Sequence, residues 1–190
     1  MLTGAHRSLL PAILRGLILG LVLGGLMLWL VRGEGAERLL ESLPGRAPRS
    51  VEVNSRAPDF SLVTLDDRTL SLAELRGKVV VLNFWATWCT PCRAEMPALE
   101  QVYQSYRERG LVIVGIDVQE PADKVRAFLP EVGVTFPIVL DSDSRLALRY
   151  RATGLPATFI VDRAGTVRDI RLGPYTEEML MARLEPLLGG

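Results

Sequence analysis

The sequence predicts one α/β domain, with a central mixed sheet flanked by helices, preceded by a single apolar helix. Three observations support this fold class. Strand-like and helix-like stretches alternate regularly from Ala57 onward, the last two strand-like stretches flank a tight turn, and a long apolar run precedes all of them. The folded part has about 130 residues, which is enough chain to bury one hydrophobic core.

The apolar N-terminal segment, residues 9–31, contains one charged residue, Arg15, followed by an uninterrupted apolar run. The run alone is shorter than the about 20 residues of a full membrane span, but Arg15 can extend its charged end to the interface. A cleaved signal peptide is the alternative, and it needs a better cleavage site than the residues after the run provide. We therefore expect an uncleaved transmembrane anchor.

Charge and composition divide the rest of the chain. Basic residues before the apolar segment weakly favour a cytoplasmic N-terminus, which puts the folded domain on the extracytoplasmic side of the cell membrane, where disulfide chemistry is common. The balance of 22 basic and 22 acidic residues gives no support to nucleic-acid binding. The expected organisation is a short cytoplasmic N-terminus at 1–8, the anchor at 9–31, a linker at 32–56 and the folded domain at 57–190.

The first half of the domain begins with a predicted hairpin. Residues 58–64 alternate apolar and polar side chains, and a turn at 66–68 leads to a second short strand. A capping box at 71–74 opens one helical turn that ends at Gly77. Residues 79–85 are apolar, β-branched and aromatic, which predicts a buried central strand.

Helices and strands alternate through the remainder. A helix from Cys89 stops at Gly110, with an expected kink at Pro97, and the continuous apolar run at 111–117 predicts a parallel strand covered on both faces. The elements expected after it are helices at 121–132, 144–150 and 176–188, and strands at 136–140, 157–161 and 166–171. The last two strands form an antiparallel hairpin, and the final helix should bury Met179, Leu180, Leu184 and Leu187.

Both cysteines of the chain, Cys89 and Cys92, lie on the turn between the central strand and its helix. Free backbone N–H groups and the helix dipole stabilise a thiolate at a helix N-terminus, so Cys89 is the candidate nucleophile. Cys92 lies one turn further into the helix and is the candidate resolving thiol. Pro91 suits the first helical turn and stiffens it. The pair is therefore expected to be redox-active.

The motif Trp88-Cys89-Thr90-Pro91-Cys92, with Asn83-Phe84-Trp85-Ala86 before it and Gly154-Leu155-Pro156-Ala157-Thr158-Phe159 far downstream, resembles the thioredoxin superfamily. The phrases 57–60 and 92–97 and the extra helix at 121–132 narrow the resemblance to the membrane-anchored TlpA/ResA-like thiol-disulfide oxidoreductases, which are related to the AhpC/TSA redoxins. It implies a thioredoxin-like fold with an N-terminal β-hairpin and an inserted helix.

The resemblance also implies a substrate-binding surface around the cysteines. Pro156 is expected to be cis and to face the pair, although only about 5% of X–Pro bonds in folded proteins are cis. Leu155 would then present its backbone to an extended peptide by strand addition. Trp88 is expected to form part of the apolar docking surface, with Thr90 and Pro91 beside it.

Glu95 is the third candidate catalytic residue. A glutamate on an amphipathic helix is usually solvated, but Glu95 follows Cys92 by three residues and matches an acidic position of ResA-like proteins. Its hypothesised role is to tune the thiols and handle protons. Asn83 supports this, because it replaces the buried aspartate of ordinary thioredoxins and cannot take a proton.

The family implies a protein-disulfide reductase that needs no cofactor or metal beyond the Cys89–Cys92 disulfide. Its expected partners are extracytoplasmic disulfide-containing proteins, among them apocytochrome c in cytochrome c biogenesis, and a membrane electron donor of the thiol-reducing type. The sequence does not itself fix the direction of electron transfer.

Other functions of the same fold remain as alternatives. A peroxiredoxin-like peroxidase needs a proline and a Thr or Ser where this chain has Leu82 and Ala86. A copper assembly factor needs a histidine in the domain, whereas the single histidine is His6. Two cysteines supply half of a zinc site, and a structural disulfide that closes so short a loop would stabilise little.

Overall fold

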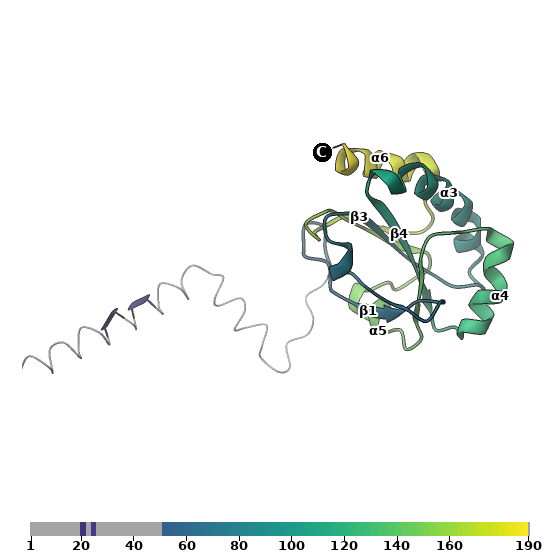
Figure 1. The fold of residues 1–190 in the computed structure, drawn as a ribbon, viewed down its shortest axis with the longest axis horizontal. Coiled ribbons are helices and arrows are strands. Elements are labelled where there is room, and N and C mark those ends of the chain that lie inside the picture. Colours follow the sequence, from purple (N-terminus) through teal and green to yellow (C-terminus); the bar gives the residue numbers. More distant parts are fainter. Residues whose placement is uncertain (1–19, 22–23, 26–50, 190) are drawn as a thin grey trace, which may run out of the picture. The chain divides into compact units, whose positions relative to one another are not determined.

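The computed structural model describes residues 20–21, 24–25 and 51–189 (Figure 1). The chain divides into two units, Met1–Pro48 and Arg49–Gly190, and the second contains the sheet. Most of the predicted anchor and linker lies outside the described residues, so both stay predictions. Within the part of the chain that the structure describes, no helix is long and apolar enough to cross a membrane.

The main sheet has five strands in the order β5-β4-β3-β6-β7. The central strand β3 pairs in parallel with β4, and β4 pairs in parallel with β5, whereas β6 and β7 run antiparallel. The bounds are β3 Val79–Trp85, β4 Leu111–Val118, β5 Ile138–Asp141, β6 Ala157–Val161 and β7 Val167–Leu172. The predicted N-terminal hairpin is a separate antiparallel pair, β1 Ser61–Val63 and β2 Thr69–Ser71. This mixed sheet confirms the predicted α/β domain, whereas the apolar helix expected before it stays a prediction.

Helices cover both faces of the main sheet. They are α3 Thr90–Tyr106, α4 Ala122–Val132, α5 Arg145–Tyr150 and α6 Glu177–Leu188, with 3-10 turns η1 Ala73–Leu75 and η2 Arg107–Arg109. One core cluster joins alternate residues of β3 to α3, α4 and α6, and the other joins the intervening residues to α5 and the N-terminal hairpin region. Figure 1 shows α3 and α6 side by side on one face, and they are in contact.

Pro97 lies inside α3, which continues as one helix to Tyr106. The proline therefore does not end the helix, and the expected kink stays a prediction. One detail differs from the sequence prediction. Met179 is 36% exposed, although Leu180 and Leu184 are fully buried. Thr176 caps α6 by accepting a hydrogen bond from the Met179 N–H. Met179 lies about 100° around the helix from Leu180, at the edge of the face that Leu180, Leu184 and Leu188 bury.

Gly115 of β4 allows a close approach that positions the central strands. A Cβ atom at this residue would lie 2.5 Å from Ile138 Cδ1, 3.1 Å from Trp85 Nε1 and 3.2 Å from Phe136 Cε2. Trp85 fills this space against the sheet and is fully buried, as the sequence predicted.

We expect Gly115→Ala to lower the free energy of unfolding by about 1–3 kcal/mol, because the added methyl group must displace packed side chains. Urea denaturation of the full chain measures the change. Gly154→Ala is the matched control, since a Cβ there meets nothing within 4 Å. Equal stability of the two variants would contradict the packing account.

Candidate active site

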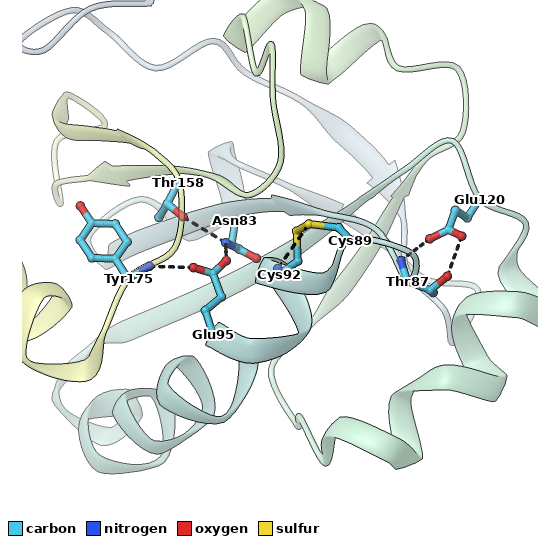
Figure 2. Close-up of a disulfide and its surroundings, with 8 residues drawn as sticks. All are labelled: Asn83, Thr87, Cys89, Cys92, Glu95, Glu120, Thr158 and Tyr175. Atoms are coloured by element: carbon cyan, nitrogen blue, oxygen red, sulfur yellow. Dashed lines mark hydrogen bonds between the residues drawn. A yellow bond between two sulfur atoms is a disulfide. The ribbon is translucent and has the colours of Figure 1, made fainter.

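Cys89 and Cys92 form a disulfide at the start of α3, with their Cα atoms 5.2 Å apart (Figure 2). Cys89 is the N-cap residue, and its sulfur accepts a hydrogen bond from the Cys92 N–H at 3.3 Å. Pro91 occupies the first turn, where it forfeits no helical hydrogen bond. Cys92 is fully buried and Cys89 is 4% exposed, so Cys89 is the more accessible sulfur-bearing residue of the two.

The surface beside Cys89 is formed by the other residues of the motif. Trp88 is 67% exposed, which is unusual for so large an apolar side chain. Thr90 and Pro91 are also exposed. The three residues therefore form an exposed surface of mixed polarity next to the cysteine turn, which suits a docking region. Their contact with substrate stays a prediction.

The loop before β6 lies near the same end of the sheet. The Leu155–Pro156 peptide bond is cis, as the resemblance implied. Pro156 is buried and Leu155 half-buried, and the next residue, Ala157, pairs with Phe84 near the end of β3. This pairing brings the loop to the strand that leads into the cysteine turn.

Glu95 is buried, with 2% of its surface exposed, so the solvated-surface interpretation is wrong. One carboxylate oxygen accepts a hydrogen bond from Asn83 Nδ2 at 2.8 Å, and the other accepts one from the Tyr175 backbone N–H at 2.8 Å. Burial raises the pKa of Glu95 to about 7, although these donors and Arg171 oppose the rise. The carboxyl group can therefore gain or lose a proton near neutral pH.

Asn83 lies on β3 between Glu95 and Thr158, and its amide nitrogen donates to both, to Thr158 Oγ1 at 3.0 Å. Within the described part of the chain, its buried Oδ1 has no hydrogen-bond partner. Sequence reasoning did not assign roles to Thr158 or Tyr175. Thr158 follows Pro156 in the quoted loop motif, whereas Tyr175 contributes a backbone N–H that no side-chain pattern could indicate.

A second set of polar groups, also unassigned from the sequence, lies on the opposite side of the disulfide in Figure 2. Glu120 accepts hydrogen bonds from the Thr87 N–H at 2.5 Å and the Thr87 hydroxyl at 2.7 Å. Lys124 lies 2.5 Å from the same carboxylate. Burial alone would raise the pKa of Glu120, but Lys124 and Thr87 hold it below its usual value. Glu120 is therefore an ionised carboxylate, and its hydrogen bonds hold Thr87, which lies two residues before Cys89 in the turn.

Among the residues that the structure describes, no group of three or more His, Cys, Asp or Glu side chains is placed to hold a metal ion. The expectation that the chain needs no cofactor beyond its disulfide stays a prediction. The site contains a disulfide whose first cysteine is the less buried of the two, and a buried carboxyl group able to exchange a proton. A cysteine pair can carry out thiol-disulfide exchange, and such a carboxyl group can assist its proton transfer.

Comparisons with known proteins agree with this chemistry. The model of the AhpC/TSA family matches residues 53–170. The thiol-disulfide oxidoreductase ResA of Geobacillus thermodenitrificans is 41% identical over 138 residues, which cover 73% of this chain and 79% of ResA. ResA of Bacillus subtilis is 37% identical over 131 residues, which cover 69% of this chain and 73% of that protein.

A solved structure shows the same fold. The crystal structure of a thiol:disulfide interchange protein of the thioredoxin family from Chlorobium tepidum superimposes with a TM-score of 0.65 at 32% identity. The match covers 73% of this chain and 99% of that one. The chain therefore belongs to the AhpC/TSA family and, within it, to the ResA-like thiol-disulfide oxidoreductases.

Proposed function

We propose that this oxidoreductase is tethered to the cell membrane by residues 9–31 and reduces disulfides of extracytoplasmic proteins. The Cys89–Cys92 disulfide at the N-terminus of α3 is the observation that carries the proposal. The similarity to ResA supports the reducing direction, and the apolar segment supports the location. The proposed client class is the CxxCH haem-attachment motif of apocytochrome c.

The exchange proceeds in two steps that balance. The Cys89 thiolate attacks one sulfur of the client disulfide, which forms a mixed disulfide and releases one client thiolate. Cys92 then loses its proton and attacks the Cys89 sulfur, which releases the second client thiolate and leaves Cys89 and Cys92 oxidised. Two electrons pass to the client, and a thiol donor in the membrane restores them.

In this proposal, Glu95 accepts the Cys92 proton during the second step. Glu95 follows Cys92 by three residues on α3, which places the two side chains on the same helical face. The hydrogen bonds from Asn83 and Tyr175 fix the carboxyl group in the buried site. Because its pKa is raised to about 7, it is basic enough to take a thiol proton and still ionised in part at neutral pH.

We expect a midpoint potential near the reducing end of the known CxxC range, which runs from about −270 to about −120 mV. Equilibration of the full chain with glutathione or dithiothreitol buffers measures it. A value near −120 mV would contradict the reductase proposal and favour an oxidase.

We expect Cys92→Ala to accumulate mixed disulfides with extracytoplasmic proteins, because Cys89 can attack but nothing resolves the product. The adducts can be purified from cells after acid quenching and identified by mass spectrometry. The control is the Cys89→Ala/Cys92→Ala double variant, which has no nucleophile. If both variants yield the same proteins, the two-step exchange is wrong.

We expect Glu95→Gln to slow resolution of the mixed disulfide by about 100-fold and to abolish its rise with pH through about 7, since glutamine accepts no proton. Stopped-flow measurement of the second step across pH 5–9, with a disulfide peptide as client, provides the profile.

Glu95→Gln should also change how the free energy of unfolding depends on pH. Glu95 has a higher pKa in the folded chain, about 7, than its reference value of 4.5, so the folded state binds more protons between these pH values. The free energy of unfolding therefore falls as pH rises through this window, by an amount on the order of 3 kcal/mol. Glu95→Gln should remove this contribution and make the fall smaller, whereas Glu178→Gln, at an exposed position, should keep both the full fall and the kinetic profile.

A further inference from the structure

Asp117, at the C-terminal end of β4, is a buried acid that the exchange mechanism does not use. Its side chain is fully buried, and neither carboxylate oxygen has a hydrogen-bond partner within the described residues. An ionised carboxylate buried without donors is expensive, so such a group normally holds a proton or acquires a partner.

Glu120 lies three residues further along the chain, is 4% exposed and interacts with the Asp117 side chain. Burial and then the negative charge and side chain of Glu120 raise the pKa of Asp117 to about 8. Two carboxylates repel each other, but a protonated carboxyl can donate a hydrogen bond to an ionised one. A proton on Asp117 thus gives both carboxyl groups a hydrogen-bond partner.

The surrounding charges indicate which acid carries the proton. Lys124 of α4 and the two donors of Thr87 all bind Glu120, so Glu120 is the ionised member. The nearby charges of the other elements are engaged elsewhere. Arg93 of α3 pairs with Glu131 and lies over the Phe128 ring, and Asp141 of β5 accepts hydrogen bonds from the Leu146 and Ala147 N–H groups.

We propose that Asp117 and Glu120 share one proton and, through Thr87, act as a positioning pair for the turn that carries Cys89. Thr87 is the physical link, because both its N–H and its hydroxyl donate to Glu120, and Cys89 donates its own N–H to Ala86 O in the same turn. While the proton is held, the pair carries one negative charge, which Lys124 offsets. This inference rests on the exchange chemistry of Cys89, but not on its direction, client or membrane location.

Loss of the proton has a defined consequence. The pair then carries two negative charges in a buried site with one nearby cation, and the repulsion strains the Glu120–Thr87 hydrogen bonds. The extra negative charge also opposes formation of the Cys89 thiolate two residues from Thr87. The ionisation of Cys89 should therefore be coupled to that of Asp117.

The test uses the reduced full chain with Cys92→Ala, so that Cys89 is the single thiol. We expect the rate of Cys89 alkylation by iodoacetamide to rise with pH in two steps, with the second near pH 8. Addition of Asp117→Asn should leave one step, because asparagine keeps a donor toward Glu120 and cannot ionise. Asp143→Asn, at an exposed acid paired with Arg145, is the control that should keep both steps.

A direct observation of the proton complements the kinetics. In pH-difference infrared spectra, the oxidised Glu95→Gln chain should show the carbonyl stretch of a protonated carboxylic acid at pH 7, which disappears above about pH 8. Glu95→Gln removes the other acid with a raised pKa and leaves Asp117 in place. Absence of the band at pH 7, or a second alkylation step that survives Asp117→Asn, would overturn the shared proton.

The outcomes also separate this proposal from the reductase proposal. A reducing potential and trapped clients can coexist with a missing infrared band, which would refute the positioning pair alone. Conversely, the band and the lost alkylation step can be observed even if the midpoint potential proves oxidising.

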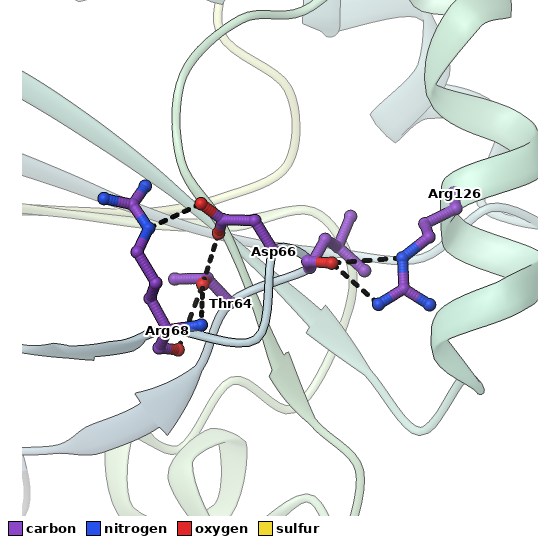
Figure 3. Close-up of polar contacts among 5 residues, drawn as sticks. Thr64, Asp66, Arg68 and Arg126 are labelled. Carbon is purple, nitrogen blue, oxygen red and sulfur yellow. Dashed lines mark hydrogen bonds and ion pairs between the residues drawn. The ribbon is translucent and has the colours of Figure 1, made fainter.

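A cavity of about 700 Å³ lies between the hairpin turn, α4 and the segment before β5. Arg126 closes one side of it by donating to the Leu65 carbonyl at 2.7 and 3.0 Å, and Arg68 pairs with Asp66 at 2.5 Å (Figure 3). Because these arginines already have partners in the chain and nothing indicates what would fill the cavity, we assign it no ligand.

Discussion

The position of the active site depends on the burial of β3. All seven residues of this strand are buried, β4 and β6 bind its two edges, and side chains of both core clusters cover its two faces. Such a strand cannot shift without breaking two hydrogen-bonded ladders and exposing apolar surface. Its C-terminal end is therefore a fixed point, and the turn at residues 86–89 places Cys89 at the start of α3, next to the exposed Trp88.

Three acids are buried around this turn, and their hydrogen-bond partners give them different protonation behaviour. Glu120 has a lysine and two Thr87 donors, so it is ionised in spite of its burial. Glu95 has two neutral donors and titrates near neutrality. Within the described residues no hydrogen-bond donor is found for the Asp117 oxygens, and burial and the charge of Glu120 raise its pKa to about 8, the highest of the three. Local partners, rather than burial alone, thus assign the charge of each acid.

The parts that follow from local sequence patterns were predictable. The alternation of apolar runs predicted the strands and helices of the sheet, because periodicity reports which faces are buried. The cysteine spacing and the strand-to-helix turn identified Cys89 and Cys92, and the loop motif around Pro156 indicated its cis bond. The exposure of Met179 was not predictable in the same way, because Met179 lies about 100° around the helix from Leu180, and only the packing of α6 decides how wide its buried face is.

The polar part of the site depended on tertiary contacts. Spacing placed Glu95 on the face of Cys92 but favoured a solvated carboxylate, since nothing local indicates that Asn83 of β3 and the backbone of Tyr175 converge on it. The Thr87–Glu120 contact joins residues 33 apart, and Asp117 ends an apolar strand whose sequence gives no sign of an acid facing Glu120. Such pairs become visible only when the sheet brings strand ends together.

Because residue 83 of β3 is an asparagine and not an acid, β3 has a different role in the proposed chemistry. Asparagine cannot hold the proton, but its amide nitrogen fixes Glu95 and Thr158 together, so the strand orients the base instead of acting as the base. The proposed base and the resolving thiol then lie on the same helix, three residues apart. Helix geometry sets their separation. The distance of a proton acceptor on β3 from Cys92 would depend instead on how α3 packs against the sheet, whereas Glu95 and Cys92 belong to one helix.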